Sequence, residues 1–445
     1  METDVLTDLL EELAREAPTG GAPPGQLWRR GRRMARTRRV GTVAIAAVAC
    51  VLLIALGSVT WQQRAVEPPV ADTETKTYVP ARIYTPSPFL PGTDEQGPPG
   101  VLIATIEAER EGWVDRGRGL VGVSATTGDY RFLDLPDANP EYLGDAALSP
   151  DGRHVAYWIT GSVPDPLPER PKVPSSSAFS ELPPIVGYAV YDTVTGKVGR
   201  RVQSTQHGLG SQAFVWFDPG HLAVTYGQMR DCCSATPNRT LVHDLASGTA
   251  SALSVDVTMA STNGRGTLID GSADTERRTG TSTLIGADGS TRSVRTRTSD
   301  ASRTSGSMFA VLSPDATKVA FLTGSSTPDT VELVGIEDGT TRTIDLQSLG
   351  VVAWLDATHL AAYAERPDDE AHLDLLSVDV RDGSTTTFVR NADEARFAIN
   401  LLDSPVRDQP DPPEPWSPWR ITGTAAAVVA GAAIAILVWR RRVGR

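Results

Sequence analysis

The residues that could carry chemistry in this chain of 445 residues are few and widely spaced. Three of its six histidines, His154, His221 and His359, each stand just before a predicted strand, at the same position of a repeated motif. This shared position predicts structural turn residues rather than metal ligands or proton carriers. The sequence contains no G-x-S-x-G nucleophile elbow, P-loop or EF-hand loop. We therefore predict a protein without a catalytic site, a bound metal or a cofactor.

The cysteines offer one further candidate for chemistry. Cys50 lies within a long apolar segment, whereas Cys232 and Cys233 are adjacent and lie far from it. The adjacent pair has three alternatives, namely a vicinal disulfide, free thiols, or a bridge to another chain. Two thiols without neighbouring ligands do not make a zinc site.

Three long connections, 107–118, 161–184 and 228–238, are the predicted binding surface. They occur at the same place in three consecutive repeats, so we expect them on one face of the molecule. Rigid scaffolds commonly carry function on such loops, although long loops are also tolerated as neutral insertions. The candidate binding residues within them are Trp113, Asp115, Arg170, Lys172, Phe179, Arg230, Cys232 and Cys233.

A short motif recurs through the region that would position these loops. Its clearest copies are SPDGRHVAY at 149–157 and SPDATKVAF at 313–321, and weaker copies begin at Asp218, Asn263, Asp356 and Asp393. Counted from the Asp or Asn, the copies begin at 151, 218, 263, 315, 356 and 393, so successive starts are 67, 45, 52, 41 and 37 residues apart, and a period of about 40–50 residues is typical of propeller blades. Each copy but the last precedes a hairpin with a turn dipeptide such as Asp338-Gly339.

The repeat has a physical explanation. Its Asp or Asn side chain can bind the backbone two residues further on and form a tight turn. The strand that follows is apolar on both faces, as in Val155–Ile159, which suits a sheet covered on both sides by neighbouring blades. Alanine recurs at one place in five copies, which predicts close packing near an axis; these residues are Ala156, Ala223, Ala320, Ala361 and Ala398.

One hairpin, around Thr127-Gly128, precedes the first clear repeat. We expect the strand 396–402 to join the strands of 101–135 in one composite blade, which closes a ring of six blades; seven blades are the alternative. These motifs resemble those of TolB-like and WD-repeat-like β-propellers over 101–402. The resemblance implies a mainly β fold and says little about activity, because such propellers include interaction platforms, substrate-gating domains of prolyl peptidases and actinobacterial membrane proteins.

Two apolar segments, 40–61 and 421–439, contain no charged residue. As helices rising about 1.5 Å per residue, each would cross a hydrocarbon core of about 30 Å. Arginines cluster before the first segment and after the second, so the positive-inside rule predicts a plasma-membrane protein with two spans and both termini in the cytoplasm. Gly423, Ala427 and Gly431 follow small-xxx-small spacing, which favours packing between the two helices or arises by chance in an Ala-rich segment.

The predicted organisation follows from these segments. It is a cytoplasmic tail with a short amphipathic helix and an Arg-rich end (1–39), a transmembrane helix (40–61), a Pro-rich stalk (62–100), an extracytoplasmic β-propeller (101–402), a second Pro-rich stalk (403–420), a transmembrane helix (421–439) and a basic cytoplasmic tail (440–445).

The charge of the chain restricts its partners. The formal net charge is −12, and the acidic residues concentrate between the two apolar segments, which disfavours nucleic acid as a partner. We expect the lipid bilayer and a protein or envelope component as partners, and non-catalytic binding, sensing or scaffolding at the cell surface as the function. The alternatives are signalling to a cytoplasmic regulator through residues 1–39, and a propeller enzyme with an unrecognised site.

Overall fold

The computed structural model of the chain describes residues 76–112, 116–167, 183–231, 234–258, 260–270, 281–295, 310–323, 329–348, 350–366, 369–392, 395–409, 411–412, 415 and 417–443. The chain divides into two compact units, 68–416 and 1–67 with 417–445. The first unit contains the repeats.

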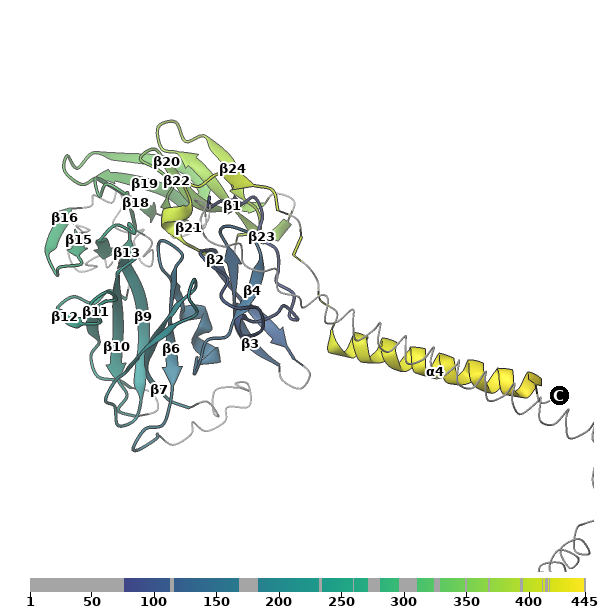
Figure 1. Ribbon diagram of the computed structural model, residues 1–445. Helices are drawn as coiled ribbons and strands as arrows, with labels where there is room; N and C mark the ends of the chain where they lie inside the picture. The colour runs from purple at the N-terminus through teal and green to yellow at the C-terminus, as the bar shows by residue number, and fades with distance from the viewer. Residues whose placement is uncertain are drawn as a thin grey trace, which may run out of the picture. The chain divides into compact units, whose positions relative to one another are not determined.

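Six four-stranded antiparallel sheets form a β-propeller (Figure 1). Blade 1 consists of β25 (Ala395–Phe397), β2 (Leu102–Glu111), β3 (Arg116–Ser124) and β4 (Tyr130–Leu133), and blade 2 of β5 (Ala147–Leu148), β6 (His154–Thr160), β7 (Ile185–Asp192) and β8 (Val198–Val202). Blade 3 consists of β9 (Leu209–Asp218), β10 (His221–Gln228), β11 (Arg239–Asp244) and β12 (Ala250–Leu253), and blade 4 of β13 (Ala260–Thr262), β14 (Thr267–Asp270), β15 (Thr281–Gly286) and β16 (Thr291–Arg295). Blade 5 consists of β17 (Ala310–Leu312), β18 (Lys318–Thr323), β19 (Asp329–Gly335) and β20 (Thr341–Ser348), and blade 6 of β21 (Gly350–Trp354), β22 (His359–Arg366), β23 (Asp369–Asp379) and β24 (Thr385–Val389).

The ring closes through blade 1, as the sequence predicted. Its first strand, β25, comes from the C-terminal end of the repeats and pairs with β2, with Ala104 opposite Phe397. The first strands of successive blades contact one another, from β25 and β5 round to β17 and β21. These strands therefore surround the axis, and the described strands form six blades rather than seven, with one further two-stranded sheet outside the blades.

The apolar core lies between the blades. Within the described residues, six clusters of buried apolar side chains each join two neighbouring blades. Strand β6 shows the principle, because Val155, Tyr157 and Ile159 face blade 1 while Ala156 and Trp158 face blade 3. The prediction of a strand covered on both sides is confirmed. The recurring alanines have no exposed surface, so a larger side chain there would have to displace a neighbouring blade.

The repeated motif forms the turn between the first and second strands of a blade. The side-chain oxygens of Asp151, Asp218, Asn263, Asp315 and Asp356 each accept a hydrogen bond from the backbone N–H two residues on. The motif serine adds further hydrogen bonds to this turn. Ser313 Oγ accepts hydrogen bonds from the N–H groups of Thr317 and Lys318 and donates one to Asp315. The Ser313 hydroxyl lowers the pKa of the Asp315 carboxyl.

Residues 76–100 differ from the predicted extended stalk. Tyr78, Val79, Ile83 and Leu90 are buried, and the chain packs against blade 1 and the end of β24. The segment includes α3 (Thr93–Gln96), whose first N–H groups approach Asp134: the Asp94 N–H lies 2.7 Å from Asp134 Oδ2. The sequence showed many prolines here, but its few apolar residues are enough to dock it.

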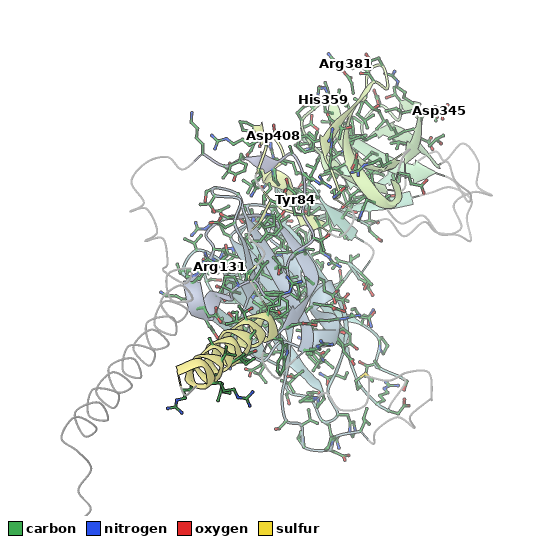
Figure 2. The ribbon with its side chains drawn as sticks, turned by 90° about the vertical axis from the view of Figure 1, so that its right-hand side faces the viewer. Tyr84, Arg131, Asp345, His359, Arg381 and Asp408 are labelled. Atoms are coloured by element: carbon green, nitrogen blue, oxygen red, sulfur yellow. The ribbon has the colours of Figure 1, made fainter. Side chains whose placement is uncertain are left out.

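The two ends of the propeller unit are joined to each other. β1 (Val79–Pro80) pairs in parallel with β26 (Val406–Arg407). Tyr84 donates its hydroxyl to the backbone of Gln409, and its N–H binds the Tyr130 hydroxyl at 3.0 Å. Burial raises the pKa of Tyr130 to about 12, so this phenol stays neutral. Tyr84 and Asp408 are labelled in this region in Figure 2.

The second unit contains one described helix, α4 (Pro418–Val443), which covers the predicted span at 421–439. Within the part of the chain that the structure describes, no helix has the combined length and apolarity required to cross a membrane. The predicted span at 40–61 lies outside the described residues, as do the amphipathic helix and the rest of 1–39.

The turn chemistry gives a first prediction. Replacing Ser313 by alanine removes the acceptor of two backbone N–H groups, so the free energy of unfolding should fall by about 1–3 kcal/mol at pH 7. The folded-state pKa of Asp315 is lowered, so the stability from its ionised form is complete above its unfolded pKa and is lost as pH falls through the folded value. The loss of unfolding free energy caused by Ser313→Ala should therefore be smaller at acidic pH.

Urea unfolding of the full chain at pH 7 and in acid measures this effect. Ser251→Ala, on the exposed strand β12, is the matched control and should change stability little. Equal penalties for the two variants at pH 7 would contradict the role given to Ser313.

Candidate functional site

The antiparallel order of the strands gives the propeller two unlike faces. Turns between first and second strands, and between third and fourth strands, lie at one end of the blades, here named the turn face. Connections between second and third strands, and those between blades, lie at the other end, named the loop face. The three predicted binding loops follow the second strands β2, β6 and β10, so they share the loop face.

The loops themselves are described only in part. Most of 107–118 is strand, because β2 and β3 pair from Leu102 to Glu111 and leave only 112–115 between them, a correction to the predicted long loop. Of the eight candidate binding residues, seven lie outside the described residues: Trp113, Asp115, Arg170, Lys172, Phe179, Cys232 and Cys233. Their roles, and a vicinal disulfide, remain predictions.

Arg230 is the described member of that set. It is exposed near the end of the β10–β11 hairpin, just beyond a bridge between Met229 and Ala235. Its N–H donates to the Ser234 carbonyl at 3.0 Å, and Ser234 Oγ donates to Asp231 at 2.6 Å. These contacts shape a tight turn, and the structure brings no second predicted site residue to Arg230 among the described ones.

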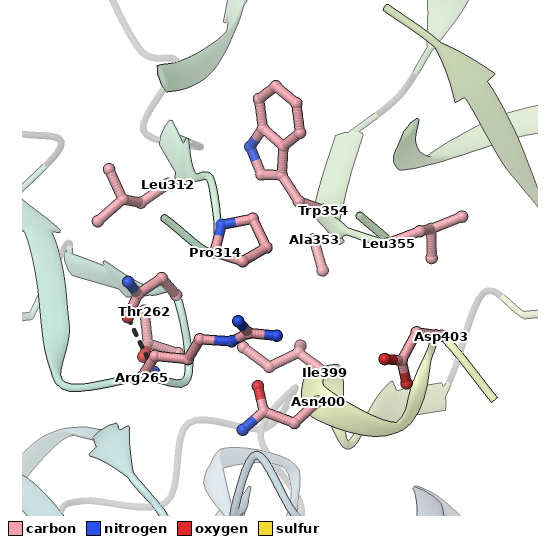
Figure 3. Close-up of a pocket in the computed structure, with 11 residues that line it drawn as sticks. Thr262, Arg265, Leu312, Pro314, Ala353, Trp354, Leu355, Ile399, Asn400 and Asp403 are labelled. Atoms are coloured by element: carbon pink, nitrogen blue, oxygen red, sulfur yellow. Dashed lines mark hydrogen bonds between the residues drawn. The ribbon is translucent and has the colours of Figure 1, made fainter. Parts of the chain in front are cut away.

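A pocket lies at the other end of the axis, on the turn face (Figure 3). Blades 4, 5 and 6 supply part of its wall, and the chain just after β25 supplies the rest. It is small and partly open to solvent. The lining residues are Thr262, Asn263, Arg265, Leu312, Pro314, Ala353, Trp354, Leu355, Ile399, Asn400 and Asp403.

The short helix η2 (Ile399–Leu401) forms one side of the pocket and is hydrogen-bonded to the repeat turns of blades 2 and 4. Asn400 donates its backbone N–H to the Pro150 carbonyl at 2.9 Å and its Nδ2 to the Gly264 carbonyl at 3.0 Å. Gly264 has φ of 70°, and a Cβ there would stand 2.4 Å from Asn400 Oδ1. Glycine is thus required at this position both by backbone conformation and by the close approach of Asn400.

The apolar wall is equally well fixed. Leu312 and Trp354 pack in the clusters between blades 4 and 5 and between blades 5 and 6. The indole Nε1 of Trp354 donates to the Val311 carbonyl at 3.1 Å, and the Lys318 ammonium lies 5.9 Å from the Trp354 ring. Because these side chains are already ordered, they can orient a ligand without a further loss of conformational entropy on binding.

Two opposite charges face the pocket. Arg265 lies in the repeat turn of blade 4, and Asp403 follows η2. Figure 3 shows their charged groups pointing toward one another across Ile399. Neither side chain has a hydrogen bond or ion pair with another described residue, although their signs are complementary. No sequence pattern indicates this pair, because 138 positions separate the two residues and only ring closure brings them together.

His221 and His359 have the structural role in the turn that the sequence predicted, whereas His154 Nδ1 is buried and has no hydrogen-bond partner among the described residues. His221 Nδ1 lies 3.0 Å from Asp218 Oδ2 in its own turn, and His359 Nδ1 lies 2.8 Å from Asp356 Oδ2. His359 also lies between that turn and Asp379, whose pKa is held well below its usual range by hydrogen bonds from the Arg381 side chain and backbone (Figure 2). No cluster of three metal-ligating side chains occurs among the described residues.

Comparison with known proteins adds little to this geometry. No family model and no curated protein matches the sequence. Among solved structures, the chain is similar to an uncharacterized protein from Listeria monocytogenes, with 11% identity and a TM-score of 0.40 over 71% of this chain and 87% of that one. It is also similar to TolB from Acinetobacter baumannii, with 13% identity and a TM-score of 0.35 over 67% and 69% of the two chains.

A third match is a puromycin-hydrolyzing peptidase from Mycobacterium tuberculosis, with 15% identity and a TM-score of 0.35 over 65% of this chain and 45% of that one. At such identities and TM-scores, these matches carry no argument about function.

The pocket geometry gives a second prediction, on Gly264. Gly264→Ala should lower the free energy of unfolding by about 1–2 kcal/mol through backbone strain and by a further ~1–3 kcal/mol through the clash with Asn400. Gly339→Ala is the matched control, because Gly339 also has positive φ, 61°, but open space around its Cβ position. Thermal or urea unfolding measures the loss of stability in each variant. Equal losses would contradict the prediction, because they would show that Asn400 moves away from the new Cβ at no cost in free energy.

Proposed function

We propose that this protein is a membrane-anchored, extracytoplasmic β-propeller that binds a small ligand at the axial pocket of its turn face and performs no catalysis. The observation that carries the proposal is the pair Arg265 and Asp403, two opposite charges that point into one pocket without partners among the described residues. A small number of precisely placed polar or charged groups fixes the orientation of a ligand in a binding site.

The composition of the pocket supports binding rather than reaction. Its polar side chains are Thr262, Asn263, Arg265, Asn400 and Asp403, together with the Trp354 indole. The Thr262 hydroxyl donates to the Phe217 carbonyl and accepts from the Gly264 N–H, so it is engaged in the turn. A nucleophile next to a general base is the usual minimum for covalent hydrolysis, and these residues offer none.

The anchoring part of the proposal rests on the chain ends. α4 spans Pro418–Val443, and its sequence from Ile421 to Trp439 has no charged residue. The pairing of β1 with β26 brings the two ends of the propeller unit to neighbouring points, as two parallel tethers would need. A protein or envelope component remains the proposed partner of the loop face.

Ligand binding is the third prediction. A panel of amino acids, dicarboxylates, amines, sugars and nucleosides should contain at least one compound that raises the melting temperature of the full chain. The gain should vanish in Leu355→Trp, because an indole in place of this partly exposed lining residue fills the small pocket. Val202→Trp, at a position 68% exposed on β8, is the control and should retain it. A panel without any such compound would sink the proposal of a binding site here.

Membrane topology is the fourth prediction. In a variant whose native cysteines are replaced by serine, Thr249→Cys places a thiol beside the turn between β11 and β12. A membrane-impermeant thiol reagent should label it in intact cells, whereas Thr37→Cys should be labelled only after lysis. Labelling of Thr37→Cys before lysis, or of Thr249→Cys only after it, would reverse the proposed orientation.

A further inference from the structure

The charges of the axial pocket specify more than binding in general. Arg265 presents a planar guanidinium whose N–H groups match the two oxygens of a carboxylate. Asp403 presents a carboxylate that accepts hydrogen bonds from an ammonium group. Both residues are exposed, point toward one another and have no partner among the described residues, so a ligand between them would pair with both at once.

The remaining lining fits the same kind of ligand. Asn400 uses its Nδ2 on the Gly264 carbonyl and its amide points away from Asp403, so Asp403 is the acceptor that the pocket offers to an ammonium group (Figure 3). Leu355 and Ile399 provide apolar contact. The interior of the pocket has room for about one water molecule, so a head group would lie at its open side between Arg265 and Asp403, and a longer remainder would extend into solvent.

The charge pattern also discriminates against other solutes. A dicarboxylate on Arg265 would bring its second negative charge toward Asp403, and a diamine on Asp403 would bring a positive charge toward Arg265. Two like charges within one small pocket repel each other, and the repulsion is stronger where the surroundings are partly apolar. A neutral sugar would leave both charges without ionic partners.

Resting on the proposed function, we propose that the axial pocket binds the zwitterionic head group of a small amino acid or short peptide, with its carboxylate on Arg265 and its ammonium on Asp403. The site thereby recognises the two charges of the ligand and the distance between them. Free amino acids and short peptides share this chemistry, but they differ in the distance between the two charges.

Titration calorimetry on the full chain tests the assignment with alanine, dialanine, N-acetylalanine and alaninamide. At least one of the two zwitterions should bind about tenfold or more tightly than either single-charge analogue, since each charged contact contributes roughly that factor. Whichever zwitterion binds more tightly identifies the charge separation that the pocket accepts.

Two variants assign the ends of the ligand. Arg265→Gln should remove the advantage of the zwitterion over alaninamide while keeping its advantage over N-acetylalanine. Asp403→Asn should do the converse. Arg153→Gln and Asp382→Asn, which remove exposed charges on the turn face outside the pocket, are the matched controls and should leave all four affinities unchanged.

The outcomes separate this inference from the proposed function. If another compound of the wider panel binds and is blocked by Leu355→Trp, while neither zwitterion is preferred, the pocket is a binding site and the zwitterion assignment is wrong. If a zwitterion binds equally well to Arg265→Gln and Asp403→Asn, the assignment is also wrong. If no compound binds at all, both proposals fail.

Discussion

The structure depends on one constraint, that every blade is apolar on both faces. A blade with one face open would expose the side chains that now fill the cluster beside it, so each sheet needs a neighbour on both sides. Only a closed ring provides this for all six. β25 closes the ring by giving blade 1 its first strand from the far end of the repeats. The seam is thus held by strand pairing as well as by the apolar cluster that includes Ile103, Ala361 and Phe397.

The features that the sequence predicted well are local ones. The Asp or Asn turn, the strand after it and the glycine hairpins each act within about ten residues, and their hydrogen bonds form as the residue types suggest. Even the most divergent repeat, at Asn263, folds into the same turn, because its Oδ1 accepts from the Arg265 and Thr267 N–H groups. Blade number followed from counting these turns and from the displaced hairpin at Thr127-Gly128.

The features that the sequence did not predict depend on contacts between residues that are far apart in the chain. Residues 76–100 look like a stalk because prolines dominate their composition, but Val79, Ile83 and Leu90 find a surface that only the folded blades create. The extension of β2 and β3 into 107–118 was hidden because Glu, Arg and Gly dominate this stretch, so the alternation of apolar and polar residues that marks a strand is absent. The axial pocket collects residues from four separate turns, and no spacing rule connects Arg265 with Asp403.

The short connection from η2 to β26 has a mechanical consequence. Asp403 borders the axial pocket, and Val406, three residues later, pairs with Val79 at the root of the other chain end. A pull on either end therefore acts within a few residues of the pocket wall. By thermodynamic reciprocity, a ligand that held Asp403 in place would also resist that pull, and tension that shifted Asp403 would weaken ligand binding by the same free energy. If the axial pocket binds a ligand as proposed, its occupancy would therefore change how firmly the propeller holds its two chain ends together.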